Sequence, residues 1–126
     1  MKIYADTRPP FHVVTALGPG YVSVDAQRYE HSLLLQPDRV DATWGPTTPA
    51  LLGAEHLAPL VGIGCDVLLL GTGERQRFPA PAVLRPLAEA HVGVEIMDTR
   101  AACRTYNILV AEGRKVAAAL IVESAA

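Results

Sequence analysis

The chain has 126 residues, of which 50% are hydrophobic and 19% charged, and 11 Lys and Arg against 13 Asp and Glu give a net charge of −2 at pH 7. The length suits one domain, and the apolar fraction is too high for a disordered chain. The balanced charge argues against nucleic-acid binding, which needs a concentrated basic surface. We therefore expect a single domain over residues 1–126.

Neither a membrane span nor a disulfide framework is predicted. The longest uninterrupted apolar run, residues 116–122, has seven residues, whereas a transmembrane helix needs at least ~18. The first ten residues lack the apolar core of a secretory signal. Two cysteines, Cys65 and Cys103, are too few for a disulfide framework or a zinc site. The sequence thus predicts a cytoplasmic protein without a metal or other cofactor.

The first half of the chain has the pattern of strands and turns. Gly18-Pro19-Gly20 predicts a β-hairpin, because glycine readily adopts the positive φ of a tight reversal. Residues 40–51 contain two prolines and little periodicity, so we expect a connection there, with Trp44 packed on the core. The predicted strands of this half cover residues 3–5, 12–17, 21–24 and 31–35.

The second half alternates between strand and helix patterns, which is typical of an α/β domain. The predicted elements are a helix at 55–61 that contains Pro59, a strand at 65–70, a helix from Pro81, a strand at 93–97, a helix capped by Asp98 or Thr99 and ended by Gly113, and a strand at 116–122. A right-handed crossover makes strands 65–70 and 93–97 parallel. The pattern leaves the direction of the last strand open.

Parallel neighbouring strands would bring polar residues together at one edge of the sheet. Thr72 and Gly73 follow the first strand, Asp98 and Thr99 follow the second, and Arg104 lies in the next helix. Ligands of open α/β sheets bind at such an edge. These five residues are therefore the predicted contacts for a ligand or partner. Further arginines, namely Arg75, Arg77 and Arg100, extend a basic rim suited to a small anion or a partner's carboxylate. The alternative is that these charges are solvated or paired locally.

The sequence gives weaker evidence for catalysis than for a binding site. Gly71-Thr72-Gly73 does not open into a helix, so it is not a dinucleotide-binding fingerprint. Cys103 lies near a helix start, where a thiol pKa can fall, but its apolar neighbours predict a buried side chain. Tyr106 and Asn107 are expected to form structural hydrogen bonds to neighbouring backbone, with a ligand contact as the alternative. No catalytic residue is predicted, and an enzyme using Cys103 or Asp98 remains the rival hypothesis.

Four segments of the second half are distinctive: Asp66 to Gly73, Gly93 to Thr99, Arg104-Thr105-Tyr106-Asn107, and Glu112-Gly113-Arg114. Together they resemble the Mth-938-like family, a family of domains of unknown function that includes mitochondrial complex I assembly factor 3 and bacterial relatives. The resemblance is strong over residues 62–122 and weaker over 1–61. It implies a three-layer α/β fold around a central mixed sheet, with no established catalytic residue and no cofactor.

Together, the residues and the resemblance favour a non-enzymatic accessory protein that binds a protein partner and helps a membrane-bound respiratory complex to assemble. One alternative is a small enzyme or small-anion-binding protein that uses the crevice at the ends of strands 65–70 and 93–97. Another is a homodimer in which strand 116–122 or the Trp44 segment meets its twin.

Overall fold

The computed structural model describes residues 9–124, which form two β-sheets and three α-helices. In chain order the elements are β1 (Val14–Gly18), β2 (Tyr21–Val24), β3 (Gln27–Tyr29), β4 (Leu33–Gln36), β5 (Arg39–Asp41), the 3₁₀ helix η1 (Pro49–Leu51), α1 (Ala54–Leu57), the 3₁₀ helix η2 (Ala58–Gly62), β6 (Val67–Gly71), α2 (Pro81–Glu89), β7 (Val94–Met97), α3 (Thr99–Ala111) and β8 (Val116–Leu120). The strand predicted at residues 3–5 lies outside the described residues.

The main sheet has five strands in the order β5-β4-β8-β6-β7. β6 pairs in parallel with both β7 and β8, which confirms the predicted parallel pairing of the strands at 65–70 and 93–97. β4 pairs antiparallel with β5 and β8. The last strand, whose direction the sequence left open, therefore runs parallel to β6 and lies at the centre of a mixed sheet.

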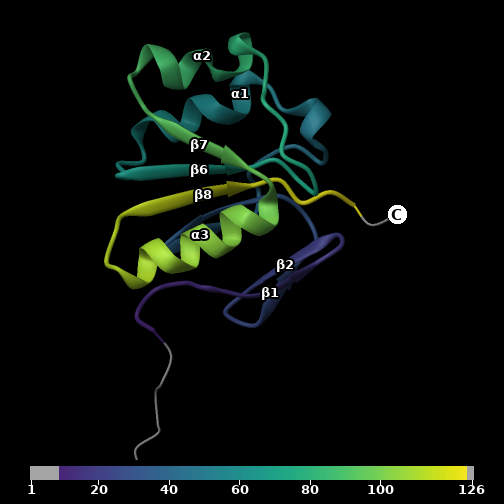
Figure 1. The fold of residues 1–126 in the computed structure, drawn as a ribbon, viewed down its shortest axis with the longest axis vertical. Helices are drawn as coiled ribbons and strands as arrows, with labels where there is room; N and C mark the ends of the chain where they lie inside the picture. The colour runs from purple at the N-terminus through teal and green to yellow at the C-terminus, as the bar shows by residue number, and fades with distance from the viewer. Residues whose placement is uncertain (1–8, 125–126) are drawn as a thin grey trace, which may run out of the picture.

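Both faces of this sheet are covered, so the fold has three layers (Figure 1). α1 and α2 lie on one face, whereas α3 and the sheet β1-β2-β3 lie on the other. Along β8, Val116 and Ala118 belong to the core beneath α3, and Ala117 and Ala119 to the core beneath α1 and α2. Side chains of a strand alternate between faces, so β8 contributes to both cores. The predicted three-layer α/β fold is confirmed.

The first half contains the predicted hairpin and two strands that the sequence analysis missed. β3 follows β2 through Asp25 and Ala26, which adopt φ values of 52° and 69°. Glycine usually marks such a turn, and its absence here hid the third strand. β5 overlaps the start of the predicted connection at residues 40–51, and it pairs with β4 at the edge of the main sheet.

The helix predicted at residues 55–61 is in fact two short pieces. α1 ends at Leu57, and the chain continues as η2 with Pro59 in its first turn. Proline has no N–H to donate in a helix interior, which accounts for the change of geometry. The last strand ends at Leu120, two residues earlier than predicted.

Two side chains of α3 fasten the N-terminal segment to the core. The Tyr106 hydroxyl donates to the His12 carbonyl oxygen at 2.8 Å. Asn107 bonds both backbone groups of Val14: its Oδ1 accepts from the Val14 N–H at 2.9 Å and its Nδ2 donates to the Val14 carbonyl at 2.8 Å. The predicted structural role of these two side chains is confirmed, but the backbone they bond belongs to the distant N-terminal segment and not to neighbouring residues. Burial raises the pKa of the Tyr106 hydroxyl, so it stays protonated.

Tyr106→Phe tests the value of this fastening. We expect a loss of about 1 kcal/mol or more in the free energy of unfolding, because the His12 carbonyl loses its donor while the buried ring is kept. Urea denaturation measures this loss. Ile108→Ala, on an exposed part of the same helix, is the control and should change stability little. Equal stability of Tyr106→Phe and the native protein would contradict the assignment.

Candidate functional site

The three parallel strands β6, β7 and β8 end at the same edge of the sheet, as their arrowheads show in Figure 1. Beyond the ladder, the Thr72 N–H donates to the Met97 carbonyl at 2.9 Å, and the Ile121 N–H donates to the Gly71 carbonyl at 2.9 Å. The segments that leave the strands thus stay side by side for another residue. This edge is where the sequence predicted a crevice.

Thr99 joins all three of these segments. Its N–H donates to the Gly73 carbonyl at 2.8 Å, and its hydroxyl accepts from the Gly73 N–H at 2.8 Å. The same hydroxyl donates to the Ile121 carbonyl at 2.7 Å. Thr99 is only 6% exposed, so its side chain shapes the edge from within.

Thr72 is also buried, at 1% exposure, and its hydroxyl holds the loop that follows β6. The hydroxyl donates to the Arg75 carbonyl at 2.6 Å and accepts from the Arg77 N–H at 3.0 Å. Both threonines predicted as ligand contacts therefore have hydroxyl groups engaged with backbone.

Position 73, directly after Thr72, requires glycine. Gly73 has a φ of +95°, and a Cβ there would collide with the Glu123 carboxylate and crowd Pro49. The Glu123 Oε1 accepts from the Glu74 N–H at 2.9 Å. Because Gly73 has no Cβ, Glu123 of the C-terminal segment can pack against the end of β6.

Asp98 and Arg104 lie on α3, in different surroundings. Asp98 is the N-cap, and its Oδ1 accepts from the Ala101 N–H at 2.8 Å, as one of the two predicted capping residues. Arg104 is exposed and lines a separate hollow of about 190 Å³ against β1, together with Asn107. The structure therefore brings Thr72, Gly73, Asp98 and Thr99 to one edge and places Arg104 beside it.

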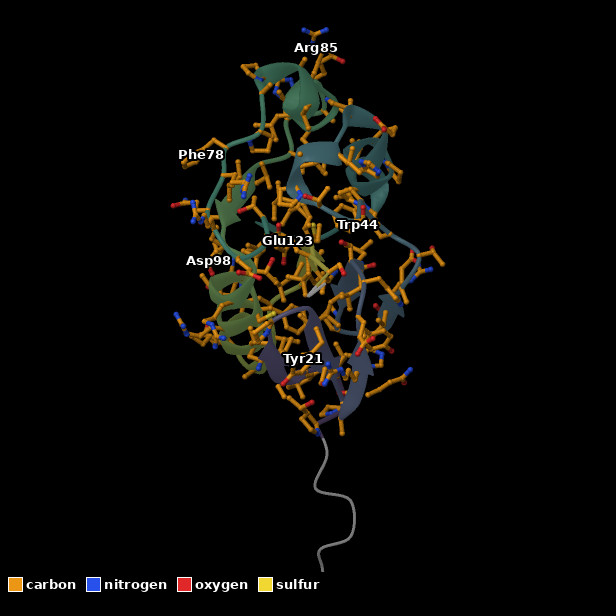
Figure 2. The ribbon with its side chains drawn as sticks, turned by 90° about the vertical axis from the view of Figure 1, so that its right-hand side faces the viewer. Tyr21, Trp44, Phe78, Arg85, Asp98 and Glu123 are labelled. Carbon is orange, nitrogen blue, oxygen red and sulfur yellow. The ribbon has the colours of Figure 1, made fainter. Side chains whose placement is uncertain are left out.

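A pocket of about 250 Å³ opens at this edge, between the strand ends and the β1–β2 hairpin. Gly73 and Thr99 line it, together with Arg100 of the predicted basic rim and with two residues that the sequence analysis missed, Tyr21 and Glu123. Figure 2 looks onto this region, with Glu123 near the centre and Tyr21 below it. Neither the hairpin tip nor the C-terminal segment carried a signal for where it would pack.

The pocket is less basic than the sequence predicted. Arg100 lines it, but so do the carboxylates of Glu74 and Glu123. This mixture of charges suits a polar group that both donates and accepts hydrogen bonds. Arg75 and Arg77 do not line the pocket, because the loop held by Thr72 directs them elsewhere.

The structure supplies no activated thiol at this site. Cys103 is 1% exposed, and burial raises its pKa to about 12, an effect that the nearby Arg100 only partly offsets. Burial also raises the pKa of Cys65. Within residues 9–124, no three His, Cys, Asp or Glu side chains are grouped so that they could hold a metal ion. None of the helices in that range is both long and apolar enough to cross a membrane.

Comparison with known proteins assigns a family. A family model described as a protein of unknown function (DUF498/DUF598) matches residues 14–121. A solved structure of a Bordetella pertussis protein, described as a Mth938-like domain, is 38% identical with a TM-score of 0.75, and the match covers 98% of this chain and 94% of that one.

Two curated relatives are similar over part of their length. The "13 kDa major membrane protein" of Francisella tularensis is 36% identical over 66 residues, which is 52% of this chain and 54% of the relative. The NADH dehydrogenase [ubiquinone] 1 alpha subcomplex assembly factor 3 of Bos taurus is 43% identical over 56 residues, 44% of this chain and 30% of the relative. The chain thus spans about half the length of the first and under a third of the second.

Gly73→Ala tests the geometry of the edge. We expect the free energy of unfolding to fall by at least about 1 kcal/mol, because alanine disfavours a positive φ and its Cβ would displace Glu123. Gly93→Ala is the matched control, since a Cβ there meets nothing within 4 Å. Thermal denaturation of both variants measures the difference, and equal melting temperatures would contradict this role for Gly73.

The state of Cys103 is tested by alkylation. Iodoacetamide at pH 8 should leave Cys103 unmodified in the folded protein, because the thiol is buried and its pKa of about 12 keeps it protonated. In urea both cysteines should react. Peptide mass spectrometry reads out each site, and rapid selective modification of Cys103 in the native state would support the rival enzyme hypothesis.

Proposed function

The chain belongs to the DUF498/DUF598 family of proteins of unknown function, and on that basis we propose that it is a non-enzymatic accessory protein that binds a protein partner. The likeness to Mth938-like domains predicted from the motifs is confirmed. We further propose that the protein acts in the cytoplasm and assists the assembly of a membrane-bound respiratory complex. The observation that carries this proposal is the 43% identity with an NADH dehydrogenase assembly factor over 56 residues.

The partner would contact the edge where β6, β7 and β8 end. In this proposal Thr72, Gly73 and Thr99 shape the backbone of the edge. The two threonine hydroxyls and the Gly73 N–H all form hydrogen bonds within the protein. Asp98 fixes the start of α3, and the exposed Arg104 offers a charge-assisted hydrogen bond to the partner.

A second candidate is the binding of a small polar molecule, which the pocket of about 250 Å³ beside Arg100 favours. The dimer hypothesis keeps one of the two surfaces first considered. β8 is paired on both sides and buried on both faces, and the Trp44 side chain is 7% exposed, so a second copy would contact exposed residues of the Trp44 segment such as Leu51.

Co-purification from native cells tests the accessory role. A tagged chain should retain subunits of a membrane complex when mild detergent is present. Arg104→Ala should retain them several-fold less while its melting temperature stays unchanged, because the side chain is exposed. Arg114→Ala, an exposed arginine at the other end of α3, is the control and should behave as the native chain.

Quantitative mass spectrometry of the eluates gives the readout. An eluate that holds a small molecule but no protein partner would instead support the second candidate. Equal retention by Arg104→Ala and the native chain would remove Arg104 from the contact surface.

A further inference from the structure

The loop between β6 and α2 exposes an aromatic side chain beside two positive charges. Phe78 is 73% exposed and projects from the surface in Figure 2, although phenylalanine is usually buried. Arg75 and Arg77 precede it and are exposed as well. Among residues 9–124, no carboxylate lies within ion-pair distance of either guanidinium group. The two charges are thus available to a partner.

This loop is held in place from both sides. The buried Thr72 hydroxyl bonds the backbone of Arg75 and Arg77 at 2.6 and 3.0 Å. The Gln76 side chain donates to the Ile96 carbonyl of the edge strand β7 at 3.0 Å. A surface that is fixed before binding loses little conformational entropy when a partner docks.

An apolar pocket of about 300 Å³ lies next to Phe78. Of the residues that the structure describes, Arg77 is the one charged side chain that lines it, and no acidic side chain does. Leu51, in the adjacent η1, is 61% exposed. Its apolar lining includes Pro49 and Ala50 of η1, Leu52 directly after η1, Pro79 of the loop and Val83 of α2.

We propose that this surface, formed by Arg75, Arg77, Phe78 and the adjacent pocket, binds an acidic segment of a partner protein that inserts one large apolar side chain. Charge complementarity selects the partner, because Arg77 lines a pocket with no acidic group among its described residues, and Arg75 adds a second exposed cation two residues earlier in the loop. Aromatic and arginine side chains are also enriched where binding energy concentrates. A concave pocket favours an inserted side chain over a flat lipid surface. The inference rests on the proposed function, because it presumes a protein partner.

The test uses the full chain, immobilised, and a library of random 12-residue peptides displayed on phage. Selected peptides should carry Asp or Glu next to a large apolar residue. A synthetic copy of one such peptide should bind Arg77→Glu and Phe78→Ala about tenfold more weakly than the native chain by fluorescence anisotropy. Arg85→Glu and Ile108→Ala are the matched controls, exposed on α2 and α3 away from the pocket, and should bind as the native chain does.

Three results would overturn the inference: no enrichment of acidic peptides, equal binding by Arg77→Glu and Arg85→Glu, or Phe78-dependent binding to phosphatidylglycerol vesicles without peptide binding. Because the peptide-binding test uses purified components, its result does not depend on the result of the co-purification from cells. A chain that retains a membrane complex yet selects no acidic peptide keeps the proposed function and loses this surface. A chain that selects the peptides but retains no complex keeps the surface and loses the assembly role.

Discussion

One hydroxyl group, on Thr99, holds together the edge of the sheet where β6, β7 and β8 end. It accepts from the segment after β6 and donates to the segment after β8, while its own residue begins the helix after β7. A buried hydroxyl that makes two such bonds fixes its neighbours closely, because either group left alone would lack a partner. The pocket beside the hairpin and the start of α3 both take their positions from this contact.

The core of the fold could be predicted because its signals are local. The apolar run around Val67 to Leu70 indicated a strand covered on both faces, and Asp98 indicated the start of α3. The packing of the hairpin against the strand ends could not be predicted, since it joins Tyr21 to a pocket lined by Glu123, a hundred residues away. Hydrophobic patterns give the face that a strand buries but not the element that covers it.

The sequence predicted that Thr72, Gly73, Asp98 and Thr99 meet at one edge of the sheet, but it could not predict the orientation of their side chains. Thr72 and Thr99 have the residue type of a ligand contact, yet their hydroxyls point into the protein and bond backbone. The arginines were grouped into one rim, whereas Arg77 lines a pocket with residues of α2 and Arg104 lines a hollow against β1. These two lie on opposite faces of the main sheet, which periodicity alone does not reveal.

The pair of hydrogen bonds between Asn107 and Val14 has a consequence for self-association. The exposed backbone of an edge strand is a template on which another chain can add a strand. At the beginning of β1, the Asn107 amide occupies both the N–H and the carbonyl of Val14. A side chain from a helix thus does at Val14 what a neighbouring strand would do, and blocks the addition of a strand at that residue.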